Sequence, residues 1–547
     1  MKNIKYILLS AVIIGFNACV EPEDVLEDNG IDTTTEVLPE LTAGTADFST
    51  YVSIGNTFTA GYTDNALFIA AQENSFPNTL AQKFALVGGG EFTQPLMNGN
   101  FGGLAVGGTR IADPRLVFGG AGPVPLESLI GPVTVSTDIA VNNPTGPFNN
   151  MGVPGAKVFH LGAPGYGNLA NFPAAANPYF IRMTGSTPNA SVLELTVGQS
   201  PTFFSLWTGI DDVLGYATSG GDATLDQITD QATFDFTYGA AIQALTANGA
   251  NGVVANIPYI TSMPHFTTVP HNPLDPTNPA FGPLIPTLNG IFGQLNQVFA
   301  FLESQGVPNA TERQIVFSET EASAVVIRDE SLANLSAQIT GVLNASPTFP
   351  AFVASFGLPV EAAPLVANLF GLVYGQARQA TADDLLVLPS SNVIGEINED
   401  FAAFLGSQGL PPALAAQFSA EGISLPLEDK WVIVPSENDE IRIATDNFNA
   451  TIQAAASAAG CAFVDANALM QQLDAGGFND GDFTSTSNLV MGGAFSLDGV
   501  HPTARGYALI ANQFMIAIDA TYGSNFEASG NLVDIGDYPT NYSPTLQ

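Results

Sequence analysis

An aspartate and a histidine, Asp498 and His501, stand three residues apart in the segment FSLDGVHPTARGY (residues 495–507). A carboxylate at this spacing can fix the tautomer of the imidazole and stabilise its protonated form, as a general base requires. Of the four histidines in the chain, only His501 has this carboxylate before it and a helix start directly after it. The pair therefore points to acid–base chemistry; the plainer alternative is a surface turn that enters a helix.

Three further short segments combine glycine with polar residues at or near the ends of apolar runs, where α/β folds place ligand chemistry. The first follows the strand-like run at 51–54 and forms a turn flanked by glycines. These segments are GNTFTAGY (55–62), NMGVPGA (150–156) and GIDD (209–212).

Strand-like and helix-like segments alternate along the chain, which predicts an α/β fold. Helical periodicity is clearest at 230–248 and 503–522. Residues 283–425 differ, because apolar helical stretches there are broken by proline and glycine. We interpret them as a large, mainly helical insertion that could cap the site. Apolar runs typical of strands are found at 51–54, 202–206, 252–258 and 461–464.

The N-terminus has a targeting pattern. Lys2 and Lys5 precede an apolar stretch at 6–16 that is too short to span a bilayer comfortably, and small residues then precede Cys19. The pattern resembles a bacterial lipoprotein signal at 1–18, with lipid attached to Cys19; an ordinary signal peptide with an incidental cysteine is the alternative. Acidic residues after Cys19 resemble a surface-export signal. We therefore predict an outer-membrane lipoprotein, attached to the membrane through this lipid only.

The composition excludes some partners. The chain has 51 acidic and 13 basic residues, a formal charge of -38, which argues against nucleic acid. Charged residues make up only 12% and hydrophobic residues 46%, so the chain folds. We predict a flexible acidic tether at 19–46, a folded domain at 47–525 and a C-terminal tail at 526–547. The histidines are not spaced as a zinc site, and the acid–base chemistry expected of this chain needs neither a metal nor an organic cofactor.

Taken in order, the four segments resemble the SGNH, or GDSL-type, hydrolases, and most of all a branch carried on bacterial lipoproteins. The resemblance implies a three-layer α/β/α fold with a mostly parallel sheet, and ester hydrolysis by a serine, a histidine and an aspartate. It makes His501 the base and Asp498 its orienting partner, and it places Thr57 at the position of the serine. Gly152 matches the glycine whose N–H serves the oxyanion hole, and Asp211 takes the place of the asparagine of that hole.

Two of these residues depart from the family pattern. Thr57 keeps a hydroxyl but adds a methyl group on Cβ, which restricts χ1 and crowds the attack. Ionised Asp211 donates no hydrogen bond and repels an oxyanion; it helps only if protonated, which burial near Asp212 would favour. Alternatively, the backbone N–H groups of Thr57 and Gly152 form the oxyanion hole alone.

We therefore predict a lipid-anchored envelope ester hydrolase with a Thr57–His501–Asp498 triad. Its substrate is an ester of a lipid, a small acyl compound or an acetylated glycan. The alternative is a surface lipoprotein that kept the fold, lost turnover and serves as a binding or assembly module. Asp498 and His501 favour the enzyme, since a decayed site would lose its base as readily as its nucleophile.

Overall fold

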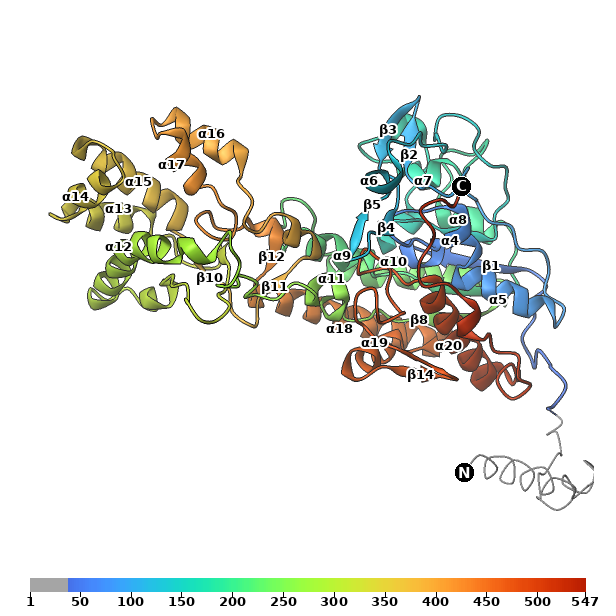
Figure 1. Cartoon of the computed structure of the whole chain (residues 1–547). Coiled ribbons are helices and arrows are strands. Elements are labelled where there is room, and N and C mark those ends of the chain that lie inside the picture. Colours follow the sequence, from blue (N-terminus) through green and yellow to red (C-terminus); the bar gives the residue numbers. More distant parts are fainter. Residues whose placement is uncertain (1–37) are drawn as a thin grey trace, which may run out of the picture.

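The computed structural model describes residues 38–547, which form two lobes (Figure 1). One is an α/β lobe, made by residues 38 to about 270 and about 435 to 547. The other is a helical lobe from the middle of the chain, which extends sideways from it. The predicted signal peptide, Cys19 and most of the predicted tether lie outside the described residues.

The α/β lobe contains a five-stranded sheet in the order β13-β8-β7-β1-β6, and every pair in it is parallel. This confirms the predicted α/β fold. The four predicted apolar runs form strands because a parallel sheet covered on both faces requires apolar side chains throughout. β6 is a fifth strand that the sequence did not predict, since the pattern of its segment indicates a turn. The strands are β1 (Tyr51–Gly55), β6 (Asn150–Gly152), β7 (Phe203–Trp207), β8 (Asn251–Ala255) and β13 (Ala462–Val464).

Two helix pairs pack against the sheet. In one pair Phe76 of α5 (Phe76–Ala85) contacts Phe514 of α20 (Ala504–Tyr522), with ring centroids 4.8 Å apart. In the other, α10 (Gln231–Thr246) packs along α18 (Pro435–Ala459). The helix that follows His501, α20, begins where the Thr503 hydroxyl accepts the N–H of Gly506, a cap that fixes the end of the loop carrying Asp498 and His501.

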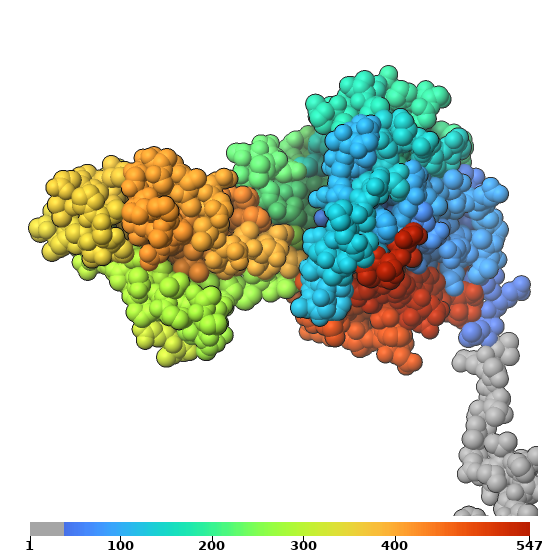
Figure 2. Space-filling model, turned by 45° about the horizontal axis from the view of Figure 1, so that its top comes forward, coloured from blue at the N-terminus to red at the C-terminus, as the bar shows by residue number. Residues whose placement is uncertain are grey.

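The helical lobe has its own hydrophobic core, built from side chains between Leu274 and Val434. The lobe is thus wider at both ends than the predicted 283–425. Figure 2 shows that it meets the α/β lobe through a narrower waist and lies beside it. Its main helices are α12 (Ile285–Ser304), α13 (Ser336–Ala345), α14 (Phe349–Ser355), α15 (Ala363–Tyr374), α16 (Glu399–Ser407) and α17 (Pro412–Gln417).

Short antiparallel strand pairs stiffen the base of this lobe. They are β9 (Val326–Arg328) with β10 (Ala377–Gln379), and β11 (Leu385–Leu386) with β12 (Val432–Ile433). Between residues 38 and 547, no single helix is long and apolar enough to cross a membrane. The pair Phe349–Ser355 and Val360–Tyr374 meets that test together, but it is bent by 116°.

Both described ends of the chain pack on the α/β lobe. The Thr45 N–H donates to the carbonyl of Tyr522 at 2.8 Å, and Ala46 is buried, so the end of the predicted tether is docked. In the predicted tail, Phe526 and Ile535 are buried in the main core. These segments are anchored because their apolar side chains fill space beside α20. The sequence did not predict this, since few apolar residues stand among acidic residues and threonines there.

Candidate active site

The polar segments meet at the carboxyl ends of three neighbouring strands. Thr57 follows β1 and opens the short helix α3 (Thr57–Ala60), Asp211 follows β7 and opens α9 (Asp211–Thr218), and Gly155 follows β6. The order β7-β1-β6 puts β1 at the point where the strand sequence reverses, which is where open parallel sheets bind ligands.

Asp498 and His501 form a buried, hydrogen-bonded pair. The Nδ1 of His501 lies 2.8 Å from Oδ2 of Asp498, and Oδ1 of Asp498 accepts the N–H groups of Val500 and His501, both at 2.8 Å. Burial alone would raise the pKa of Asp498, but the charge of His501 and these hydrogen bonds hold it well below its ordinary value. Asp498 therefore stays ionised and fixes the imidazole.

The other ring nitrogen of His501 is free for chemistry. Since Nδ1 faces a carboxylate, neutral His501 carries its proton there and its Nε2 is an acceptor. This Nε2 is buried and has no hydrogen-bond partner within residues 38–547. The rings of Phe58 and Tyr62 hold the imidazole, with centroids 5.7 Å and 4.7 Å away.

The hydroxyl of Thr57 is bound to Asp211. Its Oγ1 lies 2.8 Å and 2.9 Å from the two carboxylate oxygens of Asp211, to which it donates its proton, and it accepts the N–H of Gly155 at 3.0 Å. No hydrogen bond joins Thr57 to His501 in the described chain, although both line the same pocket. Burial raises the pKa of Asp211 to about 6, against the lowering effect of the Thr57 hydroxyl.

Gly152 does not have the expected position. Its N–H donates to Oδ1 of Asn150 at 3.0 Å, and it does not line the pocket that contains Thr57. A Cβ on Gly152 would lie 2.3 Å from the backbone nitrogen of Ala60, so glycine here lets β6 approach α3 closely. The backbone donor that faces the Thr57 hydroxyl belongs to Gly155, whose φ of 76° turns the loop toward β1.

His265 is a pocket residue that the sequence does not single out. Its Nδ1 lies 2.9 Å from the carbonyl oxygen of Asp498, and its backbone N–H donates to the carbonyl of Gly499 at 2.9 Å. Burial lowers the pKa of His265, so the ring is neutral and donates from Nδ1. It braces the loop that carries Asp498. The sequence could have indicated His265 by its position after the β8 strand, because the carboxyl end of β8 lies at the same edge of the sheet as those of β1 and β7.

The pocket itself is open and mixed in character, with a volume of about 510 Å³. Aromatic and apolar side chains stand beside the polar groups, including those of Tyr62, Tyr179 and Leu214. Pro389 reaches the pocket from the helical lobe, which otherwise leaves it uncovered. Within the described residues, no group of three histidine, cysteine or acidic side chains is arranged to hold a metal ion.

Comparison with known protein families gives a match in the C-terminal part of the chain. A family model described as GDSL-like Lipase/Acylhydrolase matches residues 399–514. This segment includes Asp498, His501 and most of α20, whereas Thr57, Gly155 and Asp211 precede it. Neither the curated proteins nor the solved structures contain a match to the chain.

Proposed function

We propose that this chain, which carries a GDSL-like lipase/acylhydrolase domain, hydrolyses carboxylic esters with Thr57 as the nucleophile. The observation that supports this most is the buried Asp498–His501 pair, whose unpartnered Nε2 lines the same pocket as the Thr57 hydroxyl. The match supports the hydrolase family; the composition of the triad is our inference from this geometry.

The proposed reaction begins when the Thr57 hydroxyl leaves Asp211 and turns to His501. Oγ1 bonds to the ester carbonyl carbon while its proton passes to Nε2 of His501, and the carbonyl oxygen becomes an oxyanion. The nearest backbone donors are the N–H groups of Gly155 and Thr57, which donate to Oγ1 of Thr57 and to Oδ2 of Asp211 in the structure and would turn to the oxyanion as the hydroxyl leaves Asp211. His501 then gives the proton to the departing alkoxide. A water molecule repeats the sequence on acyl-Thr57, which releases the acid and restores the hydroxyl.

Asp211 sets the condition for this reaction. As a carboxylate it holds the Thr57 hydroxyl and repels the developing oxyanion, whereas as a carboxylic acid it can donate a hydrogen bond as an asparagine would. With a pKa of about 6, Asp211 changes between these forms within the physiological range. We therefore propose an enzyme that is most active in mildly acidic conditions.

The substrate we propose is an uncharged or weakly charged ester: a lipid, a small acyl compound or an acetylated glycan. The chain's formal charge of -38 opposes strongly anionic substrates, and the mixed lining of the pocket suits an acyl group beside a polar part.

The test is hydrolysis of a short-chain p-nitrophenyl ester by the whole chain, with Thr57→Ala and His501→Ala as the variants that remove nucleophile and base. Turnover by the wild type that both variants abolish would support the triad. Turnover that survives Thr57→Ala would contradict it. Thr57→Ser serves as the matched control, because it keeps the hydroxyl and removes only the methyl group.

A second candidate function is a binding module without turnover. It is favoured by the Thr57 hydroxyl, which already has an acceptor in Asp211 and a donor in Gly155. This candidate would be supported if the wild type does not hydrolyse the ester and the Thr57→Ser/Asp211→Asn double variant does. It would also show that the base is intact.

We further propose that the protein is anchored in the outer membrane through lipid on Cys19, with no other membrane attachment. The sequence pattern of residues 1–24 supports this. Metabolic labelling with a fatty acid would test it, since Cys19→Ala should lose the label while Cys461→Ala, a change in the buried free cysteine, should keep it.

A further inference from the structure

A tight turn at 63–66 lies against the loop 496–502, the base loop, which carries the proposed base. The first and last residues of the turn exchange two backbone hydrogen bonds, both of 3.0 Å. Its central residues, Asp64 and Asn65, have φ of 51° and 61°, as a type I′ turn requires. Aspartate and asparagine tolerate this backbone better than other residues with a side chain, so the sequence TDNA suits the turn.

The turn is bonded to the base loop at several points. The Asp64 N–H donates to the hydroxyl of Ser496 at 3.0 Å, and Oδ1 of Asp64 accepts the N–H of Leu497 at 3.1 Å. The Thr63 hydroxyl donates to the carbonyl of Pro502 at 2.9 Å. All five residues are buried, so water does not compete for these hydrogen bonds. The turn and the base loop therefore keep one relative position.

The turn also supplies a donor to the carboxylate of Asp498. The Asn65 N–H donates to Oδ2 of Asp498 at 2.7 Å, and this is the oxygen that lies 2.8 Å from Nδ1 of His501. The two N–H groups that donate to Oδ1 belong to the base loop itself. Asn65 thus brings a donor across 433 residues to the oxygen that orients the imidazole. A carboxylate held by donors at both oxygens keeps its direction toward Nδ1.

The same stretch of chain carries the proposed nucleophile. Thr57 precedes Asn65 by eight residues, and the hydroxyl of Tyr62, which lies between them, donates to the carbonyl of Asn65 at 2.7 Å. The ring of Tyr62 packs on that of His501, with centroids 4.7 Å apart. The segment that follows β1 therefore presents the nucleophile near its start and holds the partner of the base at its end.

We infer that the turn at 63–66 positions the base, with Asn65 as a positioning residue whose N–H fixes Oδ2 of Asp498. The side chain of Asn65 is exposed, so the positive φ of this residue, and not its amide group, aims the N–H. A part in turnover rests on the proposed function. The effect on the Asp498–His501 hydrogen bond does not, because that bond can be observed without turnover.

The readout is the proton on Nδ1 of His501 in the NMR spectrum of the full chain. A short hydrogen bond to a buried carboxylate shifts this proton downfield of the amide protons, and its loss in His501→Ala assigns it. Asn65→Val should move the signal upfield or abolish it, because a β-branched side chain opposes positive φ and draws the N–H away from Asp498. Asn65→Gly should keep the signal, since glycine adopts this backbone freely. In the p-nitrophenyl ester assay, kcat/KM should fall at least about tenfold in Asn65→Val and recover in Asn65→Gly.

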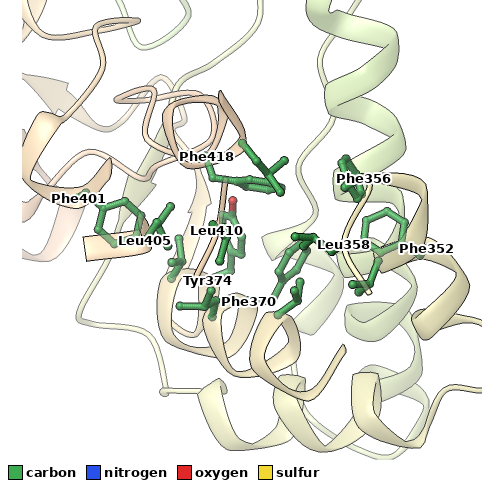
Figure 3. Close-up of a pocket in the computed structure, with 14 residues that line it drawn as sticks. Phe352, Phe356, Leu358, Phe370, Tyr374, Phe401, Leu405, Leu410 and Phe418 are labelled. Carbon is green, nitrogen blue, oxygen red and sulfur yellow. The ribbon is translucent and has the colours of Figure 1, made fainter. Parts of the chain in front are cut away.

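Two matched controls separate this role from a general loss of stability. Asn142→Val makes the same change at another exposed asparagine with positive φ, 55°, which does not line the pocket. Leu405→Ala opens space in the apolar cluster between α15 and the α16–α17 hairpin, a core separate from that of the α/β lobe (Figure 3). Both variants should keep the wild-type signal.

An unchanged signal in folded Asn65→Val would overturn the inference. Loss of the signal in either control would overturn it too, because it would trace the effect to destabilisation, as would equal losses in Asn65→Gly and Asn65→Val. If Asn65→Val does not fold by circular dichroism, Asn65→Ala gives the same comparison with less strain. A wild type without the downfield signal would also overturn the inference. A wild type with the signal and the expected variant pattern, but without turnover, would refute the proposed function alone.

Discussion

Replacing Asp211 with asparagine should make the proposed hydrolase faster at neutral and alkaline pH. The carboxylate of Asp211 accepts the Thr57 hydroxyl at 2.8 Å and 2.9 Å, and in the proposed reaction it would repel the developing oxyanion. Asparagine has nearly the same shape, but it is neutral at every pH and has an amide donor. The substitution therefore removes the repulsion, supplies the donor and loosens the hold on the Thr57 hydroxyl, with a side chain of nearly the same size.

The size of the gain follows from the pKa of Asp211, which burial raises to about 6. At pH 8, two units higher, about 1% of the enzyme carries the protonated form, and at pH 6 about half does. If the protonated form alone is active, Asp211→Asn should raise kcat/KM about a hundredfold at pH 8 and about twofold at pH 6. The larger factor matches what one oxyanion donor typically contributes.

The assay is kcat/KM for a p-nitrophenyl ester between pH 5 and 9, measured on wild type and Asp211→Asn. A ratio that stays constant with pH would refute the role given to Asp211 titration. A variant slower than wild type throughout would mean that the carboxylate itself serves the reaction, as an anchor or a base.

Melting temperature provides an independent check on the same residue. The folded pKa of Asp211, about 6, lies above its ordinary value of 3.8, so folding favours the protonated acid. The cost of ionising Asp211 is therefore absent below about pH 4, grows between about pH 4 and the folded pKa near pH 6, and stays at about 3 kcal/mol above that. Asp211→Asn should melt above the wild type at pH 8, and the difference should shrink toward pH 4.

Gly152→Ala should lower the free energy of unfolding by about 1–3 kcal/mol, seen in the denaturation midpoint, because its Cβ would lie 2.3 Å from the nitrogen of Ala60; an unchanged midpoint would contradict the close packing. Asp384→Ala should cost about 3 kcal/mol, since it takes two 2.7 Å hydrogen bonds from the half-buried guanidinium of Arg378. In Asp384→Ala, amide hydrogen exchange should become faster in the helical lobe alone. Equally faster exchange in both lobes would contradict two separate hydrophobic cores. Asp498→Asn should reduce ester hydrolysis about 10³–10⁴-fold. Because the pKa of Asp498 is held low in the fold, the stability it gives is present above about pH 4 and lost as pH falls through the folded pKa. The melting-temperature difference from wild type should therefore be large at pH 7 and small in acid; a constant difference would contradict the ionised pair.

Much of the fold could be predicted because a parallel sheet requires continuous apolar runs. The runs at 51–54, 202–206, 252–258 and 461–464 correspond to β1, β7, β8 and β13. β6 could not be found in this way, since it has three residues and includes an asparagine and a glycine. Its pairing with β1, and not its own sequence, makes it a strand.

The site was predictable where its contacts are local. Asp498 and His501 are three residues apart, so their spacing alone brings them together. His265 contacts the carbonyl of Asp498 across 233 residues, and no pattern within its own segment encodes that contact. The choice between Gly152 and Gly155 depends on the direction of a backbone N–H, which is set by the positive φ at Gly155.

The two departures from the family pattern at Thr57 and Asp211 act on one another. The buried carboxylate of Asp211 needs a donor and holds the Thr57 hydroxyl with both oxygens, whereas a neutral asparagine, with a single acceptor oxygen, would hold that hydroxyl less strongly. Thr57→Ser alone would keep this hydrogen bond, so it would relieve the crowding but not free the nucleophile. Asp211→Asn alone would free the hydroxyl but leave the methyl group beside the attacking oxygen. The effects of the two changes on kcat/KM should therefore be non-additive, with the double variant faster than the product of the single effects.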